Sequence, residues 1–388
     1  MRDGLRIIDS DGHTVEPRDL WDRYLDPPLR GRLGWFHRQV QSPTTLRTFD
    51  GRLAYAPCML AGEQVTAMRW TMDETRRRFG KAAENGFDGA SVAAALDTEG
   101  VDLMVIYGPG YDMWFEGIDP ALAAALARAY GRWLADYSAA SGGRVVGAGP
   151  LPIQDVKLAL AELEHAYHHL GIRAFWVRPN PIGGRTLGDR YYDPLYEALQ
   201  DLDVPLGVHE FMGAELPAAG RDRFSTVVEW HTCVHPMEQQ MAMLAMMVRG
   251  VFDRFPRLRV GYLEAGCAWV PFWLHRIEEH LELAGWKEAP GLQATPLEYF
   301  KRQCFVTCDP DETLLHSAID ALGDENILFA TDYPHPDSKY PNVVSSFLDL
   351  PRVSLDSKRR IMWDNALRFY NLDASLTVCP AGPATPAG

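Results

Sequence analysis

The chain has 388 residues, 47% of them hydrophobic, and a formal net charge of -14 at pH 7. This size allows one large buried core, and the acidic balance argues against a nucleic-acid binder, which needs a basic face. Six scattered cysteines without a Cys-x-x-Cys pair favour reduced thiols over a disulfide framework. We find neither an apolar run of membrane-spanning length nor a signal-peptide core, so we expect a soluble cytoplasmic protein.

The first predicted element is a strand in the segment 5–17, LRIIDSDGHTVEP. Its first half is apolar and partly β-branched, which is typical of a buried strand. Its second half carries Asp9, Asp11, His13 and Glu16. Alternate side chains of a strand share one face, so Asp9, Asp11 and His13 can present oxygen and imidazole ligands together to a divalent ion. The alternative for this stretch alone is an ordinary polar exit from a strand into a loop.

The passage 33–96 does not continue the strand pattern, and we interpret it as an insertion over one end of the fold. It is rich in Trp and Arg, and it includes Trp70. Most of such an insertion is expected to decorate the surface. Long loops of compact enzymes are often lids, however, so we take Trp70 as a candidate substrate-binding residue.

From residue 101 onward, apolar strands alternate with helices. With the first strand, they make about eight units, which predicts a (β/α)8 TIM barrel with the insertion after strand one. No glycine-rich nucleotide-binding loop follows any of them. We expect one domain over 1–372 and a disordered tail over 373–388. The predicted strands after the first are 101–108, 145–152, 172–179, 204–210, 258–266, 304–309 and 326–335.

Chemically active side chains fall at the ends of these strands. They are Asp11 and His13 after strand one, Arg178 after strand four, His209 and Glu210 after strand five, Glu264 after strand six, Asp309 after strand seven, and Asp332 and His335 after strand eight. Each has a structural alternative: an isolated histidine can simply be hydrogen-bonded, Arg178 can pair with a neighbouring carboxylate, and Glu264 can cap a helix. In a (β/α)8 barrel, however, these ends meet on the face that holds the active site. Their convergence predicts a catalytic site with one metal ion.

Four motifs resemble the amidohydrolase superfamily, in the branch of aminocarboxymuconate-semialdehyde, hydroxybenzoate and carboxyvanillate decarboxylases. They are DSDGH (9–13), LEAGCAWVPFWLHRI (263–277), ATDYPHPD (330–337) and IMWDNALRFYNL (361–372). The resemblance covers nearly the whole chain except the insertion, and it is more specific for the branch than for any substrate.

The resemblance implies one divalent ion, zinc or manganese, held by Asp11, His13, His209 and Asp332. Two departures from the family pattern matter. The usual His-x-His or Glu-x-His pair is here Asp11 with His13, which implies a site richer in oxygen ligands. Glu264 stands where the known decarboxylases usually carry a histidine, which leaves the proton-transfer step open.

The favoured function is a metal-dependent lyase that decarboxylates a small carboxylated aromatic or cyclic substrate without oxidation. Glu264 or His335 is then the candidate general acid, Arg178 can anchor a second anionic group, and Glu210 is a further candidate substrate-binding residue. The first alternative is a metal-dependent hydrolase of an amide, lactone or similar bond, with Asp332 as base and Glu264 or His235 assisting the leaving group. The second is a barrel that binds without catalysis. We expect a small-molecule substrate, no nucleic acid, no membrane and a homodimer.

Overall fold

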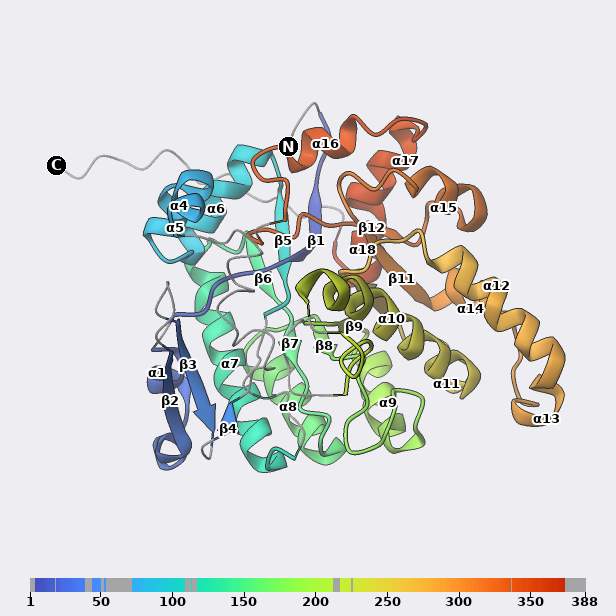
Figure 1. Ribbon diagram of the computed structural model, residues 1–388, viewed down its shortest axis with the longest axis horizontal. Coiled ribbons are helices and arrows are strands. Elements are labelled where there is room, and N and C mark those ends of the chain that lie inside the picture. Colours follow the sequence, from blue (N-terminus) through green and yellow to red (C-terminus); the bar gives the residue numbers. More distant parts are fainter. Residues whose placement is uncertain are drawn as a thin grey trace.

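The computed structural model describes residues 4–17, 19–38, 44–49, 52–53, 72–108, 113, 117–211, 217–224, 226–335 and 337–373. Parallel strands surround a central core and helices cover them (Figure 1). These parallel strands are β1 (Ile8–Gly12), β5 (Leu103–Ile106), β6 (Val145–Gly147), β7 (Gly149–Pro150), β8 (Phe175–Val177), β9 (Leu206–His209), β10 (Val260–Leu263), β11 (Cys304–Cys308) and β12 (Ile327–Phe329). Nearly all their residues are buried, as expected for parallel strands covered on both faces.

The hydrogen-bonded order is β1-β5-β6 in one sheet and β7-β8-β9-β10-β11-β12 in the other. Ala148 separates β6 from β7, yet its amide donates to Ile106 of β5, and the amide of Gly149 donates to Ala174 beside β8. The predicted strand 145–152 is therefore one strand that changes its partner midway. Counted in this way, the described residues form eight parallel strands, as the sequence predicted.

The last strand meets the first through the backbone. The amide of Asp332 donates to the Asp11 carbonyl at 3.1 Å, and the amide of His13 donates to the Tyr333 carbonyl at 2.6 Å. These bonds lie just beyond the end of β12, so the two ends of the strand order are neighbours. The fold is a (β/α)8 barrel, and the carboxyl ends of its strands share one face.

Helices follow the strands along the chain and cover them (Figure 1). Side-chain caps define several starts: Asp88 accepts from the Ser91 amide before α6, and Thr226 forms a capping box with Glu229 before α10. The main helices are α6 (Gly89–Glu99), α7 (Pro120–Ala140), α8 (Val156–His169), α9 (Asp193–Asp201), α10 (Val227–Val248), α12 (Val270–His280), α14 (Pro296–Gln303), α15 (Leu315–Leu322), α16 (Val343–Leu348) and α18 (Asn365–Tyr370). Shorter helices are α1 (Leu20–Tyr24), α11 (Val251–Arg254), α13 (Trp286–Glu288) and α17 (Leu355–Arg359).

Parts of the predicted insertion are described. An antiparallel sheet of β2 (Leu33–Arg38), β3 (Thr44–Phe49) and β4 (Arg52–Leu53) lies beside α7, apart from the barrel strands (Figure 1). Two short helices, α4 (Met72–Phe79) and α5 (Lys81–Glu84), precede α6. Trp70 and most of the predicted tail lie outside the described residues. Among the described helices we find none with the length and apolar character needed to cross a bilayer.

Candidate metal centre

The four predicted metal ligands come together at the carboxyl ends of β1, β9 and β12. The Nε2 atom of His209 lies 3.1 Å from Oδ1 of Asp11, and Nε2 of His13 lies 3.0 Å from Oδ1 of Asp332. Asp11, His13 and His209 are each at most 1% exposed. Charged and imidazole groups are costly to bury without partners, so a shared cation is a natural occupant of this place.

Two further side chains, Glu264 and His335, join these four. Donor atoms of Asp11, His13 and His209 form one group, and those of His13, Glu264, Asp332 and His335 form a second, with all atoms of a group within 4.8 Å of one another. Oε2 of Glu264 lies 3.2 Å from Nε2 of His209. Nδ1 of His335 lies 2.7 Å from Oδ1 of Asp332 and 3.4 Å from Oε1 of Glu264.

Unsatisfied buried atoms test whether these residues fit a metal ion. Nε2 of His13, Oε2 of Glu264 and Oδ1 of Asp332 are buried and lie close to other charged or imidazole groups of the cluster, yet none of the three makes a hydrogen bond of good geometry to a described residue. Buried polar atoms rarely stay unpaired, and nitrogen and carboxylate oxygen are the donors of zinc and manganese sites. The residues present therefore fit a divalent ion.

Neighbouring groups hold the two imidazoles that are predicted to be ligands. Nδ1 of His13 donates to the Tyr107 carbonyl at 2.8 Å, which leaves the lone pair on Nε2 free to face the centre. His209 stacks on Phe211, with ring centroids 4.2 Å apart, and also on Tyr107, with ring centroids 5.5 Å apart. The ring of His335 stacks on that of His13 at 4.0 Å. Both ligand rings thus have little freedom to turn away.

Backbone geometry directs two of the carboxylates. Glu264 has a φ of 51° and Asp332 a φ of 55°, a left-handed conformation that residues other than glycine seldom adopt. The Glu264 amide donates to Oγ1 of Thr307, on the neighbouring strand, at 3.0 Å. Such strained residues cluster at functional sites, where the surrounding structure holds them in place.

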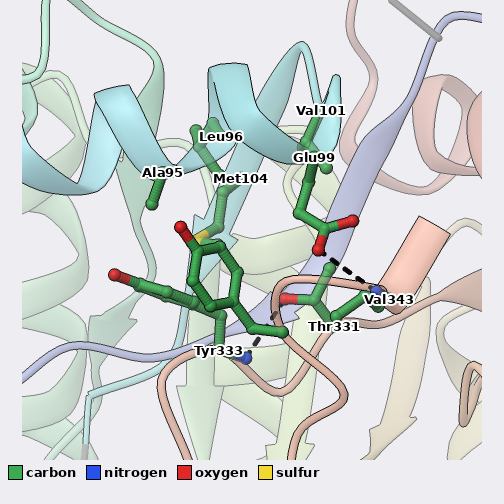
Figure 2. Close-up of a pocket in the computed structure, with 9 residues that line it drawn as sticks. Ala95, Leu96, Glu99, Val101, Met104, Thr331, Tyr333 and Val343 are labelled. Atoms are coloured by element: carbon green, nitrogen blue, oxygen red, sulfur yellow. Dashed lines mark hydrogen bonds between the residues drawn. The ribbon is translucent and has the colours of Figure 1, made fainter. Parts of the chain in front are cut away.

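Buried hydrogen bonds between Asp9 and Thr331, which we call the strap, connect the first strand to the segment after β12. The amide and hydroxyl of Thr331 both donate to the Asp9 carboxylate, and Oγ1 of Thr331 accepts from the Tyr333 amide. Figure 2 shows Thr331 and Tyr333 beside a small apolar pocket under α6, where Glu99 accepts from the Val343 amide. None of the candidate metal donors lines that pocket, so the pocket is separate from the candidate metal site.

The electrostatics keep the carboxylates charged. Burial would raise the pKa of Asp332, but His335 and His13 outweigh it and lower the pKa to about 2. Burial likewise opposes ionisation of Glu264, yet His235 and His209 hold its pKa well below the usual range. Conversely, Asp332 and Glu264 raise the pKa of His335 well above its usual value despite burial. Ionised carboxylates are the form that binds a cation.

The other predicted site residues have different surroundings. Arg178 and Glu210, predicted to bind substrate, are 1% and 0% exposed and form a buried ion pair with each other. Arg178 also donates to Asn180 and to the Phe211 carbonyl. His235 lies on α10 with Nδ1 3.6 Å from Oε2 of Glu264. The roles predicted for these side chains stay predictions, and Trp70 lies outside the described residues.

Sequence reasoning overlooked several supporting residues. Phe211 comes two positions after His209, so strand alternation already indicated that it lies on the same side. Thr307 is the polar residue of the apolar strand β11, which was a second available signal. Asp9 and Glu16 were noted as metal-capable, yet neither is in a donor group: Asp9 binds Thr331, and Glu16 accepts from the Tyr130 hydroxyl.

Comparison with known proteins shows which protein family this chain matches. Residues 116–372 match the family model described as amidohydrolase. A curated relative, 2-amino-3-carboxymuconate-6-semialdehyde decarboxylase from Dictyostelium discoideum, is 27% identical over 237 residues, which cover 59% of this chain and 62% of that protein. The match thus spans less than two thirds of the relative.

Solved structures share the fold. An amidohydrolase from Mycobacterium avium subsp. paratuberculosis superposes with a TM-score of 0.74 at 22% identity, covering 95% of this chain and 99% of that one. A dihydroxybenzoic acid decarboxylase from Polaromonas sp., with bound manganese and the inhibitor 2-nitroresorcinol, gives a TM-score of 0.64 at 21% identity, covering 95% and 97%. At these identities the likeness establishes the barrel.

Proposed function

The chain belongs to the amidohydrolase family, and from this premise we propose that it is a metal-dependent lyase that removes a carboxyl group from a small aromatic or cyclic acid. The observation that carries the proposal is the convergence of Asp11, His13, His209 and Asp332 at the carboxyl face of the barrel. The decarboxylases among its relatives support this reaction class.

The metal would be held by Asp11, His13, His209 and Asp332. When bound, a divalent ion supplies positive charge that attracts the substrate's carboxylate and an adjacent oxygen and stabilises the negative charge that develops in the reaction. Of the two ions expected from the sequence, we propose manganese over zinc, because carboxylate-rich sites suit the harder ion. The manganese in the Polaromonas decarboxylase supports that preference.

The chain's own residues then manage position and protons. Phe211 is 3% exposed and presents an aromatic side chain beside His209, which suits a flat ring and excludes water. Loss of carbon dioxide leaves the bonding electron pair on the substrate carbon, and that carbon must take up one proton. We assign its delivery to His335, whose side chain is 27% exposed and contacts both Asp332 and Glu264.

Several finer points are part of the same proposal. We propose that Arg178 and Glu210 contribute to substrate binding, that Trp70 within the insertion 33–96 contacts the substrate, and that the protein is a cytoplasmic homodimer. A Trp70→Ala variant with an unchanged KM would contradict the proposed contact between Trp70 and the substrate. Size-exclusion chromatography with light scattering would test the dimer.

The decisive experiment separates decarboxylation from the hydrolase alternative. Manganese-loaded protein is incubated with dihydroxybenzoic acids, and the carbon dioxide released is measured beside the loss of substrate. We expect stoichiometric carbon dioxide, abolished in His209→Ala and retained in His275→Ala, a matched control because His275 is an exposed histidine on α12. Turnover of amide or lactone substrates without carbon dioxide would favour hydrolysis. A protein that binds no metal would favour the non-catalytic barrel.

A further inference from the structure

We propose that Glu264 is itself a ligand of the metal ion, so that the centre contains three carboxylates and two imidazoles. This inference rests on the metal dependence proposed above and adds a residue to it. From the sequence alone, Glu264 is a candidate acid or base, a helix cap, or a metal ligand in place of Asp11, and the structure allows a choice among these.

The separations between donor atoms are the first argument. Oε2 of Glu264 is 3.2 Å from Nε2 of His209, and Oδ1 of Asp11 is 3.1 Å from that same nitrogen. Two ligands that each lie about 2.1 Å from one ion at right angles are about 3.0 Å apart. Glu264 therefore lies at nearly the same distance from Nε2 of His209 as Asp11, which is one of the four predicted ligands.

The nitrogen that Glu264 contacts is the second argument. A carboxylate that only orients a ligand histidine accepts a hydrogen bond from the ring nitrogen that points away from the ion. Glu264 instead approaches Nε2, the nitrogen of His209 that also faces Asp11. Oε2 of Glu264 makes no hydrogen bond to any described residue. An ion shared with Nε2 of His209 would give Oε2 of Glu264 the partner that the described residues do not provide.

The backbone is the third argument. Glu264 and Asp332 adopt nearly the same left-handed conformation, with φ of 51° and 55°, at two different strand ends. Each lies in the donor group that also contains His13. The left-handed backbone at Asp332 directs a predicted ligand toward the centre. The same backbone conformation at Glu264 is explained if Glu264 is also a ligand.

Two consequences follow for the chemistry. Three carboxylates around one divalent ion leave a net negative centre with hard oxygen donors, which favours manganese over zinc. A carboxylate whose oxygen is committed to the ion is a poor proton carrier, so proton delivery falls to another group, in agreement with the role given to His335.

The test measures metal binding directly. Equilibrium dialysis with MnCl2 and with ZnCl2 compares the wild type, Glu264→Ala, Glu264→Gln and Asp309→Asn. Asp309 follows the neighbouring strand β11 and belongs to neither donor group, so its variant alters a nearby acidic side chain and removes no proposed ligand. We expect Glu264→Ala to weaken manganese binding by about a hundredfold or more, beyond the roughly 10–100-fold typical of residues that only support a ligand. Zinc binding should fall less, and Asp309→Asn should stay within about threefold of wild type.

Cobalt absorption provides a readout of coordination. Replacing the ion with Co2+ and removing Glu264 should strengthen the visible bands, because cobalt with fewer ligands absorbs more strongly. Glu264→Ala with wild-type affinity and an unchanged cobalt spectrum would overturn the inference. If Glu264→Ala does not fold by circular dichroism, Glu264→Gln decides on the same criteria. A wild type that binds no metal would instead defeat the proposed function.

Discussion

The ring of Phe211 lies on the ring of His209, with centroids 4.2 Å apart and planes inclined by 26°. Phe211 also contacts Trp176 edge to face at 5.2 Å, and its carbonyl accepts from Arg178. A single aromatic side chain therefore joins a predicted metal ligand to the buried core.

Phe211→Ala should destabilise both the fold and the centre. The cavity is expected to cost about 3–5 kcal/mol of unfolding free energy, and the looser His209 ring should weaken manganese binding roughly tenfold or more. Phe211→Leu is the control, because it keeps most of the volume. Urea unfolding and equilibrium dialysis measure the two effects. Unchanged metal affinity in Phe211→Ala would show that the stacking does not hold His209.

Removing the metal should lower thermal stability, since the ion binds the folded chain and screens the clustered carboxylates. An ion present at a hundred times its Kd stabilises the fold by about 2.7 kcal/mol. We expect chelation of the wild type to lower Tm and manganese to restore it. The same treatment should leave the Tm of His209→Ala nearly constant, while His275→Ala should respond like wild type. Equal responses in wild type and His209→Ala would contradict the assignment.

Asp9→Ala should weaken the strap between the first and last strands. The Asp9 carboxylate accepts from the amides of Thr331 and Asp11 at 3.0 and 3.1 Å and from the Thr331 hydroxyl. Each buried donor left without an acceptor costs about 1–3 kcal/mol. Asp9→Asn keeps an acceptor oxygen and should retain more stability and more metal. Unfolding free energies of both variants equal to that of the wild type would show that the strap carries little of the stability.

The pair of Arg178 and Glu210 should show strong coupling. Glu210→Leu leaves a buried guanidinium without its carboxylate and is expected to cost about 3–5 kcal/mol. The double variant Arg178→Met/Glu210→Leu should lose less than the sum of the single variants, because neither charge remains. Urea unfolding of the four proteins gives the coupling energy. Additive losses would mean that the two side chains act independently.

Much of the fold could be predicted from the sequence, because apolar strands alternating with helices are a local pattern. The same pattern placed Asp11, His13, His209 and Asp332 at strand ends, and the geometry of a barrel brings such ends together. What sequence could not supply depends on contacts distant along the chain. The partner of Arg178 is on the next strand, and the irregular register of β1 between Asp9 and Gly12 separates Asp9 from the donors.

Backbone strain is the other part that sequence reasoning could not supply. Glu264 and Asp332 have a left-handed φ that the surrounding structure imposes. This conformation could not be predicted from the sequence, because residues other than glycine seldom adopt it. The change of partner at Ala148 is similar, because nothing in the run 145–152 marks where one strand pairing ends and the next begins.

The strap between Asp9 and Thr331 joins residues 322 positions apart. During synthesis on the ribosome, the segment that carries Asp11 and His13 emerges long before the one that carries Asp332. The nascent chain therefore cannot assemble the full set of donors until almost the whole barrel has left the exit tunnel. The metal binding proposed above can therefore begin only after the segment that carries Asp332 has been synthesised.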